Sequence, residues 1–151
     1  MSGTVALYVC PECSAPLVDG LDCWGQLGAI IAWEWQDPDL MAQHFLTVAS
    51  YNLQHPAQFT AEALAGLRQQ FIDYLDHGVP PHEIRRRVAS MAEGKVKVHR
   101  PEAARRLVLR RWPMTIAAVY LPNQPTGAAE RVKAWAASIR EELRVNGKSL
   151  L

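Results

Sequence analysis

Long hydrophobic runs are missing from this chain of 151 residues, although 49% of its residues are apolar. Charged residues or prolines interrupt each apolar stretch within about a dozen residues, whereas a membrane-spanning helix needs roughly 20. The N-terminus, MSGTVALYVC, also lacks the basic segment that precedes the apolar part of a secretory signal peptide. We therefore expect no membrane association and a cytoplasmic location.

Cysteine is scarce, and the three that occur are Cys10, Cys13 and Cys23. An odd number of cysteines suits a reducing compartment better than a disulfide framework. Glycine-rich phosphate loops, serine nucleophile elbows and paired carboxylates are missing as well. Nothing in the sequence therefore requires that the protein be an enzyme.

Positive charge is almost absent from residues 1–84, which hold one basic residue, Arg68, and ten acidic residues. Residues 85–111 reverse this balance, with ten basic and two acidic residues and a net charge of +8. One hypothesis is a nucleic-acid-binding module, in which basic side chains contact phosphates and Trp112 stacks on a base. The candidate contacts are Arg85, Arg86, Arg87, Lys95, Lys97, Arg110 and Arg111. We do not favour this hypothesis, because the remaining surface is acidic and no nucleic-acid recognition motif is visible.

The hydrophobic periodicity predicts a mainly α-helical protein, a small antiparallel helical bundle with an N-terminal Cys-x-x-Cys zinc-knuckle loop. Asp22 is placed to cap a helix over 23–35, whose apolar face would contain Trp24, Leu27, Ile31 and Trp35. Further helices are expected over 38–54, 61–78, 82–94, 115–121 and 128–145.

The short connections and the length of the chain indicate a single domain, residues 1–151. We divide it into a knuckle loop (1–21), a helical core (22–94), a basic extended segment (95–114), C-terminal helices (115–145) and a tail (146–151). Basic and apolar residues alternate over 95–98, which favours a short strand or an extended segment there.

The segment YVCPEC separates Cys10 from Cys13 by two residues, a spacing found in zinc knuckles and in redox-active pairs. A redox pair normally begins a helix, but Ser14-Ala15-Pro16 and Asp19-Gly20 prevent a helix from continuing beyond Cys13. A tight turn that brings two thiolates together suits zinc, which takes four ligands in a structural site. Two further ligands must then come from Cys23 and the five histidines.

Helix geometry selects these two ligands. If the helices over 23–35 and 38–54 form an antiparallel hairpin that turns near Asp37, Cys23 lies beside residue 51 and close to His55. His44 precedes His55 by eleven residues, ~16 Å along a helix, so the two cannot bind one ion. We therefore predict one structural zinc ion per chain, bound by Cys10, Cys13, Cys23 and His55. The donor set leaves the choice between zinc and iron open.

Two other interpretations stay open. Cys23 could be a buried small residue, and His55 could be an ordinary cap at a helix C-terminus. Alternatively, His44, Tyr51 and Gln54 could line a polar pocket of a metal-dependent enzyme, since His44 and Tyr51 share a helix face with His55. Against the enzyme, no carboxylate lies at metal-ligand spacing from His44 on its own helix.

Several segments together resemble a bacterial family of uncharacterised proteins, domain of unknown function 5946. They are YVCPEC, DCW, HFLTVASYNLQHP, RWPMTIAAVY and VKAWAAS, and the likeness extends from Cys10 to about Ser138. Family members usually have Cys-Pro-x-Cys-Gly, so Ser14 departs from the pattern, and Gly66-Leu67 stands where many have His-Leu. The resemblance implies that these motifs act together, and it brings no activity, substrate or partner with it.

These observations favour a zinc-stabilised binding or adaptor protein, in which the metal is structural rather than catalytic. Apolar surface left outside the core, together with the charge asymmetry, would suit a homo-oligomer or a protein partner.

Overall fold

The structure, a computed structural model, describes residues 8–93 and 97–149. Within these residues the backbone forms helices and isolated β-bridges but no strand, which confirms the predicted mainly α-helical fold. The longer helices are α1 (Cys23–Trp33), α3 (His44–Leu53), α4 (Ala61–His77), α5 (Pro81–Glu93) and α7 (Ala128–Ser149). The shorter elements are α2 (Pro38–Met41), α6 (Ile116–Tyr120) and the 3-10 turns η1 (Glu34–Gln36), η2 (Pro56–Gln58) and η3 (Glu102–Ala104). Among the described residues, no helix has the length and apolar character needed to cross a membrane.

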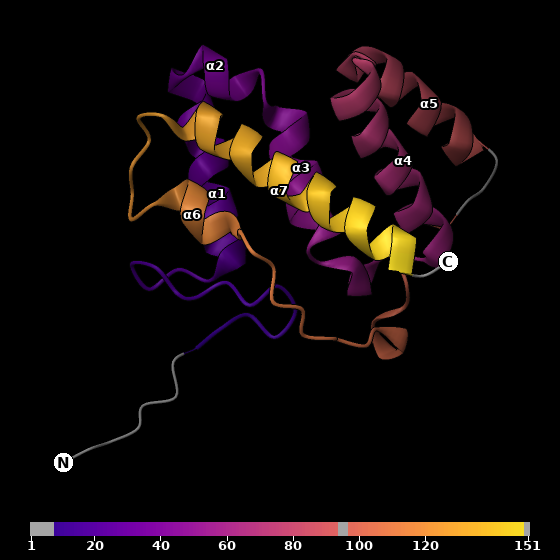
Figure 1. Cartoon of the computed structure of the whole chain (residues 1–151), viewed down its shortest axis with the longest axis horizontal. Coiled ribbons are helices and arrows are strands. Elements are labelled where there is room, and N and C mark those ends of the chain that lie inside the picture. Colours follow the sequence, from indigo (N-terminus) through magenta and orange to yellow (C-terminus); the bar gives the residue numbers. More distant parts are fainter. Residues whose placement is uncertain (1–7, 94–96, 150–151) are drawn as a thin grey trace.

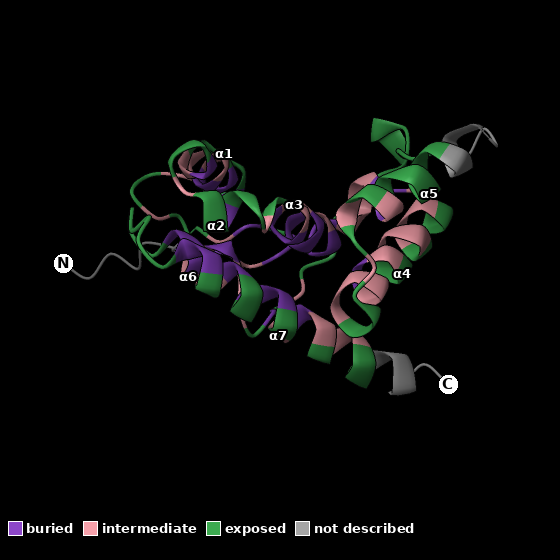
Figure 2. Ribbon diagram, turned by 90° about the horizontal axis from the view of Figure 1, so that it is seen from above, coloured by how far each residue is buried: buried purple, intermediate pink, exposed green. Residues whose placement is uncertain are grey.

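Helix α7 crosses the middle of the molecule and packs against α2, α3 and α6 (Figure 1). Helix α1 packs against α6, and α3 also packs against α4. The periodicity of α7 predicted its buried face, which contains Val132, Trp135 and Ile139. Figure 2 shows that buried residues are concentrated in α3, α6 and α7, whereas α4 and α5 are mostly intermediate or exposed. The main core therefore lies among α1, α3, α6 and α7, with α4 and α5 at its edge.

The helix ends follow from local sequence signals. The side chain of Asp22 accepts a hydrogen bond from Gly25 N at 2.8 Å, and that of Thr60 accepts one from Ala63 N at 3.2 Å. Each of these bonds satisfies an amide that has no partner inside its helix. Gly78 ends α4 in the left-handed region at φ 66°, a conformation that glycine adopts without steric cost.

The helix expected over 38–54 is divided into α2 and α3 by Ala42 and Gln43. Gln43 N donates to Leu40 O at 2.9 Å, three residues back instead of four, so the helix tightens and stops. This break brings His44, the first residue of α3, to Glu34, with 2.7 Å between Nδ1 and Oε1. The contact between His44 and Glu34 therefore accompanies a break in the helix that the sequence pattern did not indicate.

The predicted apolar face of α1 is confirmed at Leu27, which is buried, and at Ile31, which packs against the core, but it is wrong at Trp24 and Trp35. Trp24 and Trp35 are 69% and 81% exposed, and the buried stripe instead begins at Cys23 and includes Gln26. The Gln26 amide donates to Pro16 O and to Leu21 O, both at 3.0 Å, and so fixes the rotation of α1 against the N-terminal loop. Successive helix positions differ by about 100°, so this rotation moves both tryptophans to the surface.

Residues 97–112, which we call the strap, connect the region after α5 to α6 and contain no helix apart from η3. Val98 O accepts from Thr60 N, and Arg100 N donates to Gln58 O, both at 2.9 Å. The strand predicted over 95–98 falls partly in residues 94–96, outside the described part of the chain. The last helix extends to Ser149, four residues beyond the predicted end at Val145.

Candidate metal centre

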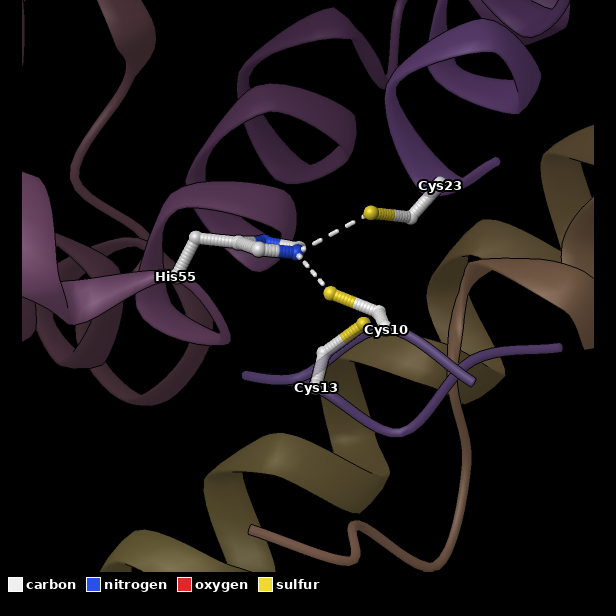
Figure 3. A group of neighbouring side chains, drawn as sticks. All are labelled: Cys10, Cys13, Cys23 and His55. Carbon is white, nitrogen blue, oxygen red and sulfur yellow. Dashed lines mark hydrogen bonds between the residues drawn. The ribbon is translucent and has the colours of Figure 1, made fainter. Parts of the chain in front are cut away.

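Three separate segments bring Cys10, Cys13, Cys23 and His55 together. Cys10 and Cys13 belong to the N-terminal loop, Cys23 is the first residue of α1, and His55 follows α3. One ligand atom from each residue lies within 4.8 Å of the ligand atoms of the others, and all four residues are buried. Figure 3 shows the three sulfur atoms and the imidazole pointing toward one common point. None of the three cysteines forms a disulfide.

Backbone hydrogen bonds shape the loop that carries Cys10 and Cys13. Cys10 N donates to Ala15 O at 2.8 Å, and Ser14 N donates to Cys10 O at 3.0 Å. Ala15 N also donates to Cys13 Sγ at 3.4 Å, a contact that stabilises negative charge on the sulfur. Ser14 has a φ of 69°, in the left-handed region that favours glycine, and this is the position at which the sequence departs from Cys-Pro-x-Cys-Gly.

The imidazole of His55 is oriented by the end of α3. Its Nδ1 donates to Tyr51 O at 2.6 Å, and because a carbonyl oxygen only accepts, Nδ1 carries a proton. Nε2 then faces the thiols, 3.3 Å from Cys23 Sγ and 3.7 Å from Cys10 Sγ. The rings of Tyr51 and His55 also stack, with 4.0 Å between their centroids. A histidine held in this way by its second nitrogen is typical of a metal ligand.

Glu12, between the two cysteines of the loop, joins the loop to the segment after His55. It is buried, and its Oε2 accepts from Ala57 N in η2 at 2.7 Å. Its backbone carbonyl accepts from Arg110 N of the strap at 2.9 Å. Sequence reasoning missed this role, because an acidic residue inside Cys-Pro-Glu-Cys gives no local signal that it caps a turn 45 residues away.

The pKa values of Cys13, Cys23 and His55 are shifted from their ordinary values. Interaction with the Cys13 thiol lowers the pKa of Cys23 to about 4; burial opposes this shift, and His55 adds to it. The same interaction with Cys23, together with burial, raises the pKa of Cys13. Burial alone would lower the pKa of His55, but hydrogen bonds with Cys23 and with Tyr51 O outweigh it and raise the value to about 9. Without a metal the centre therefore pairs a Cys23 thiolate with a His55 imidazolium at neutral pH.

The arrangement fits a tetrahedral metal ion. Zinc–sulfur bonds of about 2.3 Å and a zinc–nitrogen bond of about 2.0 Å place the ligand atoms roughly 3.5–3.8 Å apart. The two distances from His55 Nε2 to sulfur, 3.3 and 3.7 Å, already lie close to this range. The largest separation in the set is at most 4.8 Å, so closing the tetrahedron takes movements of about 1 Å. Three thiolates and one imidazole are ligands that suit zinc or iron.

The residues predicted to share a pocket have different surroundings. Tyr51 is buried beside the metal centre, with its hydroxyl 3.9 Å from Cys23 Sγ. Gln54 lies in the core, where it donates to Met114 O at 2.8 Å and accepts from Trp135 Nε1 at 3.2 Å. His44 pairs with Glu34 and lines a hollow of about 360 Å³ that neither Tyr51 nor Gln54 reaches.

The basic residues of 85–111 have mixed roles. Arg86 pairs with Glu83 at 2.5 Å, and Arg87 pairs with Asp73 at 2.9 Å. Three others, Arg85, Lys97 and Arg111, are exposed and have no carboxylate partner among the described residues.

Arg110 differs from the other basic residues because its guanidinium lies 3.7 Å from the ring centre of Trp112. It also approaches Glu142, at 3.9 Å. Trp112 itself is buried, so the ring predicted to stack on a base is covered. Lys95 lies outside the described residues.

The fold and the centre together define a class: a small helical protein whose N-terminal loop and first helices meet at a cluster of three cysteines and one histidine. The chain belongs to a family of unknown function, DUF5946, whose model matches residues 8–144. This match confirms the family that the sequence motifs resemble. Searches of curated proteins and of solved structures found no match.

Proposed function

We propose that the protein is a zinc-stabilised binding or adaptor protein that binds one zinc ion through Cys10, Cys13, Cys23 and His55. The observation that carries the proposal is the convergence of these four buried ligand atoms from three segments of the chain. Thiolate ligands persist in a reducing compartment, so the proposal includes a cytoplasmic location.

The metal has a structural role in this proposal. Four protein ligands complete a tetrahedral shell and leave no position for water or substrate. Structural zinc supplies ~10–16 kcal/mol of apparent binding free energy, as much as the whole stability of an ordinary domain. An ion at this point joins the N-terminal loop, α1 and the end of α3, which packing and a few hydrogen bonds, such as those of Gln26 and Glu12, would otherwise hold together.

The binding role is supported by apolar side chains at the surface. Trp24 and Trp35, on the outer side of α1 and η1, are largely exposed. The strap exposes further apolar residues, Leu107, Val108 and Leu109. Large exposed apolar side chains in groups are typical of surfaces that contact other macromolecules.

Native mass spectrometry with elemental analysis tests the metal. We expect one zinc per chain in the wild-type protein and its loss on treatment with a strong chelator. Cys23→Ser and His55→Ala should lose the ion, whereas His44→Ala should keep it, because His44 pairs with Glu34 away from the cluster. Full zinc occupancy in Cys23→Ser or His55→Ala would show that the ligand set is wrong. If the purified protein contained iron, the resident metal would be iron and not zinc.

A further inference from the structure

The central part of the strap is exposed and lacks backbone partners. Leu107, Val108 and Leu109 are 59%, 73% and 44% exposed. Arg105 begins this part with extended geometry, φ −81° and ψ 129°. Among the described residues, no hydrogen bond involves the backbone amide or carbonyl groups of 106–109. Figure 1 shows this segment passing along the outside of the molecule between η3 and α6.

Both ends of the strap are fixed. Near its start, Arg100 N donates to the carbonyl of Gln58 at the end of η2, and Val98 O accepts from Thr60 N. Its end is fixed by the hydrogen bond from Arg110 N to Glu12 O. Glu12 lies between Cys10 and Cys13, and Gln58 lies three residues after His55, so both anchor points adjoin ligands of the metal centre. The metal would therefore hold the exposed segment in place.

An extended segment with free amide and carbonyl groups is a template for a further strand. The sequence from 105 to 111 is RRLVLRR, so apolar residues occupy the middle and arginines both ends. Arg105, Arg106 and Arg111 have no carboxylate partner among the described residues. From these features we propose that residues 105–111 bind an extended acidic segment of a partner protein, which adds to the strap as a β-strand. The inference rests on the proposed function, because it names the partner of the metal-stabilised module.

Charge distinguishes this partner from a second copy of the chain. Two straps paired antiparallel about Val108 would place Arg106 opposite Arg110, and like charges directly opposite destabilise a strand pair. An acidic strand with apolar residues at alternate positions would place its carboxylates on the face of Arg106 and its apolar side chains on the face of Leu107 and Leu109.

Nucleic acid fits the same surface less well. Its phosphates would pair with the arginines but would leave the free backbone groups and the apolar middle of the segment uncovered. The nearby ring that could stack on a base, Trp112, is buried beneath Arg110. The geometry therefore favours a peptide strand over a single-stranded nucleic acid.

Fluorescence anisotropy with the full-length, zinc-loaded protein tests the proposal. The probe is a fluorescein-labelled peptide of seven residues that alternates glutamate and valine. We expect saturable binding, and at least tenfold weaker binding to a peptide with lysine in place of glutamate. A peptide with proline in place of valine should also bind at least tenfold more weakly, because proline lacks the amide hydrogen that a ladder requires.

Variants of the protein locate the site. The double variant Arg105→Glu/Arg106→Glu and the single variant Val108→Pro should each weaken binding at least tenfold. Arg85→Glu is the matched control, since Arg85 is an exposed arginine on α5 outside the strap, and it should bind like the wild type. Circular dichroism and zinc content verify that each variant is folded.

Several outcomes would overturn the inference. They are an absence of saturable binding by the zinc-loaded protein up to about 1 mM peptide, equal binding of the proline peptide, or equal weakening by Arg85→Glu. Tighter binding of a labelled single-stranded oligonucleotide than of the acidic peptide would also overturn it. Zinc content is measured separately. A folded, zinc-loaded protein that does not bind the peptide would refute this inference alone, whereas a protein without bound metal would refute the proposed function.

Discussion

Two contacts with Tyr51 orient the imidazole of His55, in addition to its contacts with the thiols. Its Nδ1 donates to Tyr51 O at 2.6 Å, and its ring stacks on the Tyr51 ring. Both contacts come from a residue four positions earlier, so the local course of α3 orients the imidazole. Pro56 follows directly and stops the helix, which frees the His55 side chain to turn toward the N-terminal loop.

Zinc binding at neutral pH should release protons. In the metal-free protein the pKa of His55 is raised from 6.5 to about 9, so its imidazolium stabilises the fold fully below about 6.5 and ceases to do so as the pH rises through about 9. Zinc must displace this proton and the one on Cys13, whose pKa is also raised. We expect release of roughly two protons or more per zinc at pH 7, measured by calorimetry in buffers of different ionisation enthalpy. Release of fewer than one proton per zinc would contradict the raised pKa values of His55 and Cys13.

Glu12 should contribute to stability without being a metal ligand. In Glu12→Ala the amide of Ala57 loses its acceptor, which should lower the free energy of unfolding by about 1–3 kcal/mol. Chemical denaturation of the zinc-loaded protein measures the effect. The control Glu102→Ala, at an exposed position in η3, should change stability by less than about 0.5 kcal/mol. Equal effects of the two substitutions would show that the cap is unimportant.

At the scale of secondary structure, Gln54 connects three elements. From the end of α3 it donates to Met114 O before α6 and accepts from Trp135 Nε1 in α7. Gln54→Ala would remove both bonds and leave a cavity, and we expect a loss of about 2–4 kcal/mol in thermal or chemical unfolding. Gln36→Ala, at an exposed position in η1, provides the control and should be nearly neutral. A near-neutral Gln54→Ala would argue against this description of the core.

Local signals made the helix ends predictable from sequence. Asp22, Thr60 and Gly78 act at their own helix ends, within three to five residues of the groups they bond. The approach of Cys23 to His55 was also predictable, because in an antiparallel hairpin the pairing of residues can be counted from the turn. Although a break before α3 divides the predicted helix, the pairing counted from the turn still places Cys23 next to His55.

Features that depend on tertiary contacts could not be predicted in this way. The buried stripe of α1 includes Gln26, whose partners are carbonyl groups of the N-terminal loop, so hydrophobicity alone predicted a buried Trp24 and missed Gln26. Glu12 is buried because it caps a turn that is distant in sequence. Gln54 was a possible pocket residue on sequence grounds, and its hydrogen-bond partners, Met114 O and Trp135 Nε1, come from distant segments that the sequence pattern does not reveal.

At the scale of the whole molecule, packing holds the N-terminal loop and the strap only partly against the helical core, and the proposed metal would connect them to it. The described residues of the N-terminal loop, from Tyr8 onward, contain no helix, and its cysteines Cys10 and Cys13 are half of the proposed ligand set. The strap in turn is anchored to Glu12 and to the segment after His55. A metal ion bound by these four residues would therefore hold both the loop and the strap against the helical core.

Removal of the metal should destabilise the entire fold. We expect a strong chelator to lower the melting temperature by at least about 10 °C, since several kcal/mol are lost from a domain of this size. Circular dichroism at 222 nm measures the transition, and restored zinc should restore it. Hydrogen exchange should show the strap losing protection together with the N-terminal loop. An unchanged melting temperature in protein shown to be metal-free would contradict a structural role.

X-ray absorption spectroscopy at the zinc edge tests the central claim most directly, because it counts the atoms bound to the ion. We predict three sulfur atoms at about 2.3 Å and one imidazole nitrogen at about 2.0 Å, with no oxygen ligand. In His55→Ala the nitrogen should disappear from the shell or the ion should be lost. A shell with two sulfur atoms, or with a water oxygen in place of the imidazole, would contradict the proposed centre.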